Sequence, residues 1–328
     1  MADVARTAGV SVATVSKVVN GRDGVAQATV DRVQQVIAEL GYEASLVAQS
    51  LRRHRTNVIG ILVAEFEPFS AELLKGASAA VADTGYELLA YSCGGGRADG
   101  GWERRSLSRL SGTLIDGAVI VTPAGTETGN GFPLVAVDPH TGPSGLPTVD
   151  CDSFSGAVLA TNHLLRLGHR RIGFLGGRPD LESARLREAG FRQAMAAAGV
   201  PVDEALVQTG GYRRETAAPP ARALLTRRRR PTAIFAANDL TAIATMEVAL
   251  GLGLRVPEDV SIIGFDNVPE SALAPVPLTT VEQPLRRMGA EALLLLVDLI
   301  EGVDREPHVR LPTTLVERAS CAPVSTRD

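Results

Sequence analysis

The segment DVARTAGVSVATVSKVVN, residues 3–20, reads as two short helices joined by one tight turn. In the first helix, Asp3 is placed to cap the free amides of the first turn, and Val4, Ala5 and Ala8 share one face. Gly9 allows the left-handed backbone at which such a helix ends, and Ser11 is placed to cap the next helix. This spacing predicts a helix-turn-helix, which indicates a DNA-binding function.

The second helix has an inward and an outward face. Val15, Val18 and Val19 are spaced three to four residues apart and are expected to point inward. Lys17 can reach base edges or phosphates, whereas Val12 and Ala13 are suited only to thymine methyl groups. Thr14, Ser16 and Asn20 are expected chiefly to set the register on the DNA backbone. The predicted DNA contacts of this motif are Ser11, Val12, Ala13, Thr14, Ser16, Lys17 and Asn20.

A third amphipathic helix follows and completes a small three-helix core. Its apolar stripe comprises Val30, Val33, Val36, Ile37 and Leu40, and Gly41 is expected to end it. Periodicity alone does not separate such a unit from any short helical hairpin. The particular residues of the segment do so.

Several strings along nearly the whole chain resemble the lactose-repressor (LacI/GalR) family of bacterial transcription regulators. The first is DVARTAGVSVATVSKVVNG at residues 3–21, and later ones are HLLRLGHRRIGFLGG at 163–177, SARLREAGF at 183–191 and AIFAANDL at 233–240. VPEDVSIIGFDN at 256–267 and PLTTVEQP at 277–284 also match. The resemblance implies an N-terminal DNA-binding domain and an effector-binding core.

Composition agrees with this reading without establishing it. The chain has 328 residues, of which 45% are hydrophobic, and a formal net charge of −4, which by itself does not indicate a nucleic-acid partner. Residues 1–56 carry seven basic and five acidic side chains, so the charge asymmetry has the expected sign but is small. Cys93, Cys151 and Cys321 show no metal-like spacing, and no signal segment is evident. We expect a cytoplasmic protein without metal, cofactor or membrane partner.

Residues 43–57 are expected to link the two parts as a hinge helix. A helix of about two turns is marginal in water without a packing partner. In the family that the chain resembles, this segment pairs with its twin on the operator and pushes a leucine into the minor groove. Leu51 matches that leucine, and Ala48 lies beside it. The alternative is a solvated linker that carries three arginines.

From residue 58 onward, apolar strands alternate with helices, and the series repeats after residue 152. Such alternation predicts parallel sheets with helices on both faces. The expected fold class is therefore an all-α helix-turn-helix domain at 1–42 and an α/β core at 58–328. By the resemblance, the core is like a type I periplasmic binding protein with two Rossmann-like lobes. The N-lobe takes 58–155 and 282–311, and the C-lobe takes 156–281 and 312–328.

Ligands of open parallel sheets bind beyond the carboxyl ends of the strands. Asp138, Asn238 and Asp266 each follow an apolar strand, and Arg187 can donate several hydrogen bonds from a rigid fork. In the family, these positions match polar effector contacts, Tyr212 matches an aromatic that packs on the ligand, and Phe69 is placed to line the other lobe. The structural alternatives are a turn cap for Asp266, a core role for Tyr212 and a surface helix position for Arg187.

Three features of the sequence depart from the family pattern. Ala26 stands where a serine usually caps the third helix, which should cost about 1 kcal/mol locally. Glu67 replaces the usual asparagine before Pro-Phe, and this leaves the N-lobe side of the pocket open to question. The arginine run at 227–230 is expected to be a solvated face.

These features predict a dimeric repressor that reads a pseudo-palindromic operator and responds to a sugar-like effector in the cleft between the lobes. The competing class is a transport receptor with the same core fold, which would bind sugar without touching DNA. No phosphate-binding loop, nucleophile elbow or metal-ligand cluster supports an enzyme.

Overall fold

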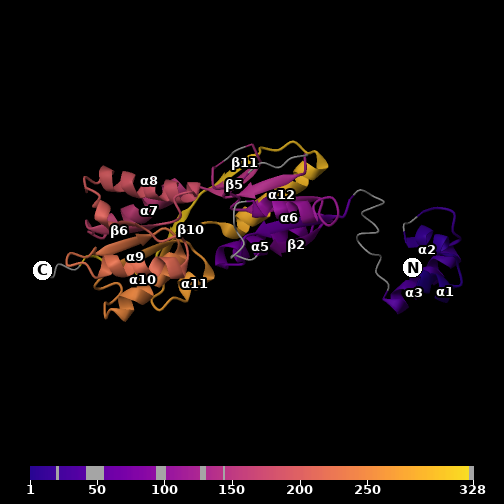
Figure 1. Cartoon of the computed structure of the whole chain (residues 1–328), viewed down its shortest axis with the longest axis horizontal. Coiled ribbons are helices and arrows are strands. Elements are labelled where there is room, and N and C mark those ends of the chain that lie inside the picture. The colour runs from indigo at the N-terminus through magenta and orange to yellow at the C-terminus, as the bar shows by residue number, and fades with distance from the viewer. Residues whose placement is uncertain (20–21, 42–54, 94–100, 126–130, 143–144, 325–328) are drawn as a thin grey trace. The chain divides into compact units, whose positions relative to one another are not determined.

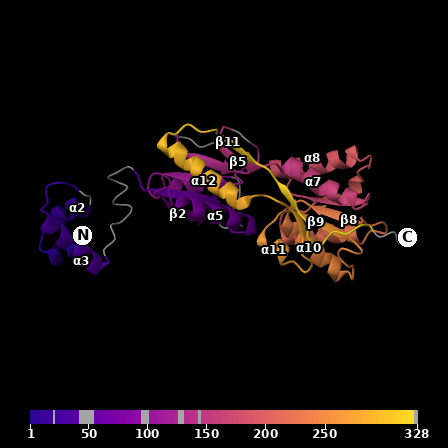
Figure 2. The same ribbon diagram turned by 180° about the vertical axis from the view of Figure 1, so that it is seen from behind.

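The computed structural model describes residues 1–19, 22–41, 55–93, 101–125, 131–142 and 145–324. Within these ranges the chain forms two compact units. The three N-terminal helices belong to one unit, and two β-sheets with their helices build the other (Figures 1 and 2). Asn20, Ala48 and Leu51 lie outside the described residues.

The N-terminal unit consists of α1 (Ala2–Ala8), α2 (Val12–Val19) and α3 (Gln27–Leu40). Gly9 ends α1 with φ 65°, and the backbone amide of Thr14 donates to the Ser11 hydroxyl at 3.1 Å, as the sequence predicts. The six side chains at its centre are Val4, Ala5, Ala8, Val15, Val33 and Val36. This small core holds α2 against α1 and α3, so the opposite face of α2 stays exposed.

Two sequence-based expectations for this unit are wrong. Asp3 lies inside the first turn of α1 and pairs with Arg6, because the helix begins two residues earlier than predicted and its N-cap is Met1. Leu40 is largely exposed, because α3 ends at this residue and turns away at Gly41. Ala26 caps α3 without any side-chain hydrogen bond, as expected from its methyl group.

The first sheet of the larger unit has the strand order β11-β5-β4-β3-β1-β2, and every neighbouring pair in it is parallel. Its strands are β1 (Val58–Val63), β2 (Glu87–Ser92), β3 (Gly117–Val121), β4 (Leu134–Val137), β5 (Thr148–Cys151) and β11 (His308–Leu311). Its helices are α5 (Pro68–Val81), α6 (Trp102–Leu110) and α12 (Leu285–Glu301). We call this sheet with its helices the N-lobe.

Helices α5 and α12 pack closely along the N-lobe (Figure 2). A Cβ atom added to Gly289 would lie 2.0 Å from the carbonyl oxygen of Leu73. A Cβ atom added to Gly76 would lie 1.8 Å from the carbonyl oxygen of Arg286. The two glycines therefore let the helix backbones approach more closely than any side chain allows. This contact fixes α12 beside α5, the helix that carries one wall of the pocket described below.

The second sheet has the strand order β12-β10-β9-β8-β6-β7, and β12 is its single antiparallel strand among the described residues. Its strands are β6 (Ile172–Gly176), β7 (Val207–Thr209), β8 (Ala233–Ala236), β9 (Ser261–Asp266), β10 (Thr279–Glu282) and β12 (Thr314–Val316). Its helices are α7 (Ser153–Arg166), α8 (Glu182–Ala197), α9 (Arg214–Leu225), α10 (Asp239–Gly251) and α11 (Pro269–Ala272), with a 3₁₀ turn, η2, at Glu204–Leu206. We call this part the C-lobe.

Side chains of β8 alternate between two apolar clusters, one on each face of the C-lobe sheet. Phe235 joins the cluster that includes Phe174 and Phe191, whereas Ile234 joins the cluster that includes Leu224 and Met246. Figure 1 shows α7 and α8 on one side of this sheet and α9 and α10 on the other. The strand is therefore buried on both faces, as its nearly continuous apolar run predicts.

The chain passes between the lobes three times, after β5, after β10 and after β11. The first and third crossings are hydrogen-bonded to each other, because the Asp152 amide donates to the Leu311 carbonyl at 2.9 Å. Since α7 starts at Ser153 and packs on α8, the first crossing lies near residue 152. We propose the lobe boundaries at the residue level as given from the sequence.

In the described part of the chain, no helix is long and apolar enough to span a bilayer.

Candidate functional site: a pocket between the lobes and an exposed helix face

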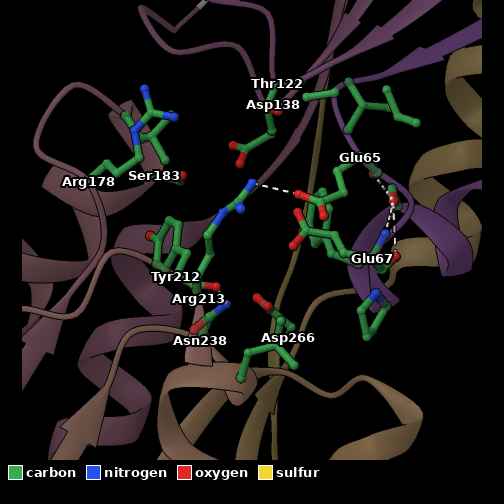
Figure 3. Close-up of a pocket in the computed structure, with 18 of the residues that line it drawn as sticks. Glu65, Glu67, Thr122, Asp138, Arg178, Ser183, Tyr212, Arg213, Asn238 and Asp266 are labelled. Atoms are coloured by element: carbon green, nitrogen blue, oxygen red, sulfur yellow. Dashed lines mark hydrogen bonds and ion pairs between the residues drawn. The ribbon is translucent and has the colours of Figure 1, made fainter. Parts of the chain in front are cut away.

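A pocket opens between the two lobes at the carboxyl ends of their strands. All six residues predicted from the sequence to contact an effector line it: Phe69, Asp138, Arg187, Tyr212, Asn238 and Asp266. Asp138 follows β4, Asn238 follows β8, and Asp266 ends β9, so the topology brings together side chains that are far apart in the sequence. Figure 3 shows the labelled polar groups around this space.

Arg187 and Asp266 form a buried ion pair at the base of the pocket. The Arg187 Nη1 lies 3.4 Å from Asp266 Oδ1 and 2.6 Å from the Ala237 carbonyl oxygen. The guanidinium also lies over the Phe265 ring, 3.8 Å from its centroid. Burial raises the pKa of Asp266 to about 7, while Arg187 and the hydrogen bond from Gln283 oppose that rise. Arg187 is thus not a surface helix residue, and Asp266 faces the pocket with a carboxyl that titrates near neutral pH.

Asp266 has an unusual backbone conformation. Its φ is 118°, and that of the next residue, Asn267, is 57°. The turn is fixed by Asp239, whose carboxylate accepts from the Val268 amide at 2.9 Å, and by Arg318, which donates to the Asn267 side chain at 2.7 Å. Strained backbone of this kind persists only where the surroundings hold it, and here it positions a pocket carboxylate.

Asn238 and Tyr212 form a second polar edge. Asn238 caps α10 by accepting from the Thr241 amide at 2.9 Å, and its amide donates to the Tyr212 carbonyl at 3.2 Å. One amide hydrogen of Asn238 therefore remains for a ligand. The Tyr212 hydroxyl is buried and makes no hydrogen bond of normal geometry, although Ser183 lies beside it. Its ring packs against Gly177, where any side chain would overlap it.

Asp138 and Phe69 come from the N-lobe. Burial raises the pKa of Asp138, while Arg187 acts in the opposite direction. Phe69 lies in the first turn of α5 and packs at the edge of the main apolar cluster. An aromatic ring and carboxyl, amide and guanidinium groups around one space suit a ligand with an apolar ring face and several hydroxyls.

Sequence reasoning missed an ion pair that joins the two lobes across the pocket. Arg213 Nη2, from the C-lobe, lies 2.6 Å from Glu65 Oε2, from the N-lobe, and Figure 3 shows the arginine side chain reaching across the space. Glu67, the departure noted in the sequence, also lines the pocket. Burial raises its pKa, with Arg213 acting against the rise. Glu67 is also the N-cap residue of α5, where its backbone amide donates to the Ser70 hydroxyl at 3.0 Å.

His140, which also lines the pocket, makes further contacts between the lobes. The His140 carbonyl accepts from the Glu182 amide at 2.9 Å and from Arg185 at 3.1 Å, and its imidazole lies 3.4 Å from Asp180. Asp180 is itself paired with Arg178 at 2.5 Å. The lobes are thus joined by contacts at two places beside the pocket, whose lining comes from both lobes.

The helix-turn-helix presents the expected outward face. Val12 is 49% exposed, and Ala13 and Lys17 are also exposed, whereas Thr14 and Ser16 are half-buried. The Thr14 hydroxyl lies 2.9 Å from that of Ser11, which fixes the start of α2. A surface hollow beside this face is lined by Lys17, Thr29 and Arg32 among others, and Arg32 was not predicted. Arg32 lies in the second turn of α3, and the uncapped N-terminus of that helix, which also borders the hollow, favours an anionic group.

A helix-turn-helix with an exposed face and a two-lobed α/β core around a polar pocket define a ligand-sensing DNA-binding transcriptional regulator. The chain belongs to the lacI family of bacterial regulatory proteins. The model of that family matches residues 1–45, and a periplasmic binding protein-like domain matches residues 161–321.

Its relatives are transcriptional regulators. The chain is 35% identical to the HTH-type transcriptional regulator CelR of Thermobifida fusca, over 97% of this chain and 96% of that one. It is 35% identical to the HTH-type transcriptional repressor PurR of Aliivibrio salmonicida, over 94% of each chain. The chain is accordingly a regulator rather than an enzyme. Among the described residues, no group of three or more His, Cys, Asp or Glu side chains could hold a metal ion.

Two solved structures match the fold over almost the entire chain. The complex of CelR with cellobiose has a TM-score of 0.74 at 34% identity and covers 97% of this chain and 98% of that one. The lac repressor dimer bound to operator and the anti-inducer ONPF has a TM-score of 0.84 at 26% identity and covers 98% of both chains.

Proposed function

We propose that the protein is a repressor that binds a pseudo-palindromic operator as a homodimer and releases or tightens its hold when a sugar-like effector binds between the lobes. The observation that carries the proposal is the convergence of Asp138, Arg187, Asn238 and Asp266 on one pocket, in a chain that also presents an exposed helix-turn-helix face.

The DNA contacts proposed for α2 follow from exposure and chemistry. Lys17 supplies a positive charge, Val12 and Ala13 supply small apolar contacts, and Ser11 and Thr14 lie at the helix N-terminus. Ser16 completes the set within the described residues. Asn20, Ala48 and Leu51 stay part of the proposal through the resemblance alone. Two such units related by a twofold axis would read two half-sites.

The effector chemistry is argued from the pocket. Carboxylates and an arginine can each bind pairs of hydroxyl groups, and the Tyr212 and Phe69 rings can pack on the C–H face of a sugar. The solved complex of the relative CelR holds cellobiose, which supports a carbohydrate for this pocket as well. The solved lac repressor structure is a dimer bound to operator, which supports dimeric binding here.

An effector changes DNA affinity only if it favours one arrangement of the lobes over another. A shift from 1:99 to 99:1 needs roughly 5.5 kcal/mol of differential affinity. The contacts between lobes at Glu65–Arg213 and at His140 show that this pocket is built from both sides. A ligand there can therefore supply contacts that depend on the lobe angle.

The test separates this function from that of a transport receptor with the same core fold. Purified full-length protein and its Lys17→Ala variant would be used to select bound fragments from a sheared genomic library, at fixed salt. We expect the parent chain to enrich a small set of sites with twofold symmetry and the variant to enrich them at least about tenfold less. Lys75→Ala, at a half-exposed position on α5, is the matched control. A parent chain that enriches no sequence would favour the transport receptor.

A further inference from the structure

Five buried side chains form a closed ring of polar contacts. One side of the ring faces the pocket, and the other lies at the crossings between the lobes. Asp266 Oδ1 accepts from Gln283 Nε2 at 2.5 Å, and Gln283 Oε1 accepts from the Cys151 thiol at 2.8 Å. The Cys151 sulfur lies 3.5 Å from the Ser153 hydroxyl. Ser153 accepts from Arg187 Nε at 3.3 Å, and Arg187 returns to Asp266.

Each member of the ring is almost completely buried, between 1% and 5% exposed. Only Asp266 and Arg187 line the pocket. Since polar groups removed from water must keep their partners, a change at one contact costs free energy unless the others adjust. The ring therefore ties the position of the pocket carboxylate to that of Gln283 and Cys151.

Gln283 and Cys151 lie where the lobes are joined. Cys151 ends β5 and is followed at once by the first crossing, while Gln283 follows β10 and precedes α12 at the second. The Thr313 hydroxyl, at the third crossing, donates to the Asp152 carbonyl at 3.3 Å. The Cys151–Gln283 bond therefore joins the first and second crossings, and the third crossing bonds to the residue next to Cys151.

We propose that Gln283 is a positioning residue that couples occupancy of the pocket at Asp266 to the angle between the lobes. This inference rests on the proposed function, since it assigns how the effector pocket communicates with the crossings. A ligand hydroxyl that bonds to Asp266 competes for the oxygen that holds Gln283. Gln283 then shifts against Cys151, and the β5 and β10 crossings move relative to each other.

The contact is specific in its chemistry. Gln283 must donate to a carboxylate with one end and accept from a thiol with the other, and an amide does both. A glutamate at this place would set two carboxyl groups against each other, and a leucine would fill the volume without bonding either. At residue 151, a serine keeps an O–H donor, whereas a valine keeps shape and loses the donor.

The experiment is amide hydrogen exchange of the effector-free, full-length protein, which needs no knowledge of the ligand. Two peptides report on the ring: residues 150–153, where the Asp152 amide bonds to Leu311, and residues 265–268, where the Val268 amide bonds to Asp239. Residues 134–137 and 233–236, inside the two sheets, report on global stability. The variants are Gln283→Leu, Cys151→Val and Cys151→Ser.

The control is Glu282→Gln, at the neighbouring residue, whose side chain bonds to Thr314 at the same crossing but is not part of the ring. We expect Gln283→Leu and Cys151→Val to raise exchange about tenfold in both reporter peptides at once, because each removes a buried hydrogen bond. Cys151→Ser and Glu282→Gln should match the parent chain in both. The peptides inside the sheets should be unchanged in every variant.

Three results would overturn the proposal. Exchange raised in 150–153 alone would show that the crossing does not communicate with Asp266. Equal effects of Cys151→Val and Cys151→Ser would show that the thiol donor does not matter. A uniform rise across both sheets would mean that Gln283 only stabilises the fold. A failure of the proposed function would instead appear as absent DNA selection by the parent chain, and it would leave these exchange results standing.

Discussion

Arg213 of the C-lobe and Glu65 of the N-lobe form an ion pair across the pocket, with 2.6 Å between Nη2 and Oε2. Both side chains are about half exposed, so the pair contributes little to unfolding stability, on the order of 1 kcal/mol or less. It does favour the observed approach of the two lobes. An effector that needs both lobes in contact is therefore bound more tightly when the pair is intact.

We expect Glu65→Gln and Arg213→Gln each to weaken effector binding up to about fivefold, with the double variant no weaker than either single one. Isothermal calorimetry with the effector found by promoter screening measures this. Arg214→Gln is the control, because Arg214 pairs with Glu247 inside the C-lobe. Additive losses in the double variant would show that the two side chains act separately.

Effector affinity should depend on pH through Asp266. Its pKa of about 7 means that the carboxyl is partly protonated at neutral pH, since burial disfavours the charged form. Hydrogen bonds to an ionised carboxylate are the stronger ones, so affinity should rise as pH increases from about 6 to 8. Asp266→Asn should bind more weakly and without that pH dependence. A parent chain whose affinity is flat over this range would contradict the assignment.

His169 should make folding stability sensitive to acid. Its Nε2 lies 3.0 Å from the Ala322 carbonyl, which can only accept, so Nε2 donates and Nδ1 accepts from Thr232 at 3.0 Å. Burial lowers the pKa of His169, so below its usual value of 6.5 the unfolded chain binds a proton that the folded chain does not. The stability contributed by the neutral form is present above that pH and is lost as pH falls.

We therefore expect His169→Gln to be less stable than the parent chain by about 1–3 kcal/mol at pH 8 and by a smaller margin at pH 5. Urea unfolding followed by circular dichroism at both pH values provides the comparison. A difference that stays constant, or grows at pH 5, would show that His169 is protonated in the folded state.

The close contact of α5 with α12 should tolerate no side chain at Gly289. An added Cβ would meet the Leu73 carbonyl oxygen at 2.0 Å, and two packed helix backbones cannot yield cheaply. Gly289→Ala should lose more than about 2 kcal/mol of unfolding stability. Gly251→Ala, where a Cβ would meet open space, should gain up to about 1 kcal/mol. Thermal unfolding of the two variants together tests this, and equal effects would refute the packing argument.

The sequence located the pocket residues that follow strands, because strand ends in a parallel sheet converge on one edge. Asp138, Asn238 and Asp266 are of this kind. Glu65 also follows a strand, β1, but Arg213 lies in the turn before α9, and the 148 residues between them hide that they pair. Gln283 was part of a matching string, but its side-chain partners, Asp266 and Cys151, end two other strands. Only the fold reveals that they meet.

Local misjudgements had local causes. Asp3 was placed one residue outside α1 because helix starts are uncertain by a residue or two when more than one position can cap. Leu40 continued the apolar stripe of α3 by periodicity alone. The helix ends at that residue, so the side chain leaves the core that buries Val33 and Val36. Periodicity predicts which face is apolar but not how far the core extends.

The salt dependence of operator affinity should identify the basic residues that contact DNA. Lys17→Ala should weaken operator binding and lower the slope of log affinity against log salt by about one, because one phosphate-directed charge is lost. Arg32→Ala should do the same if the hollow beside α2 receives a phosphate. Anisotropy titrations at four salt concentrations give these slopes. An unchanged slope for Lys17→Ala would remove that residue from the interface.

We expect one ligand in the pocket to control the affinity of the protein for DNA. Fluorescence anisotropy of the purified chain on labelled DNA from its own promoter, at fixed salt and with a panel of sugars, tests it most directly. We predict specific binding that one sugar changes at least about tenfold, with Asp266→Asn binding the same DNA and failing to respond to that sugar. Specific binding that no sugar alters, or an Asp266→Asn variant that responds like the parent chain, would contradict it.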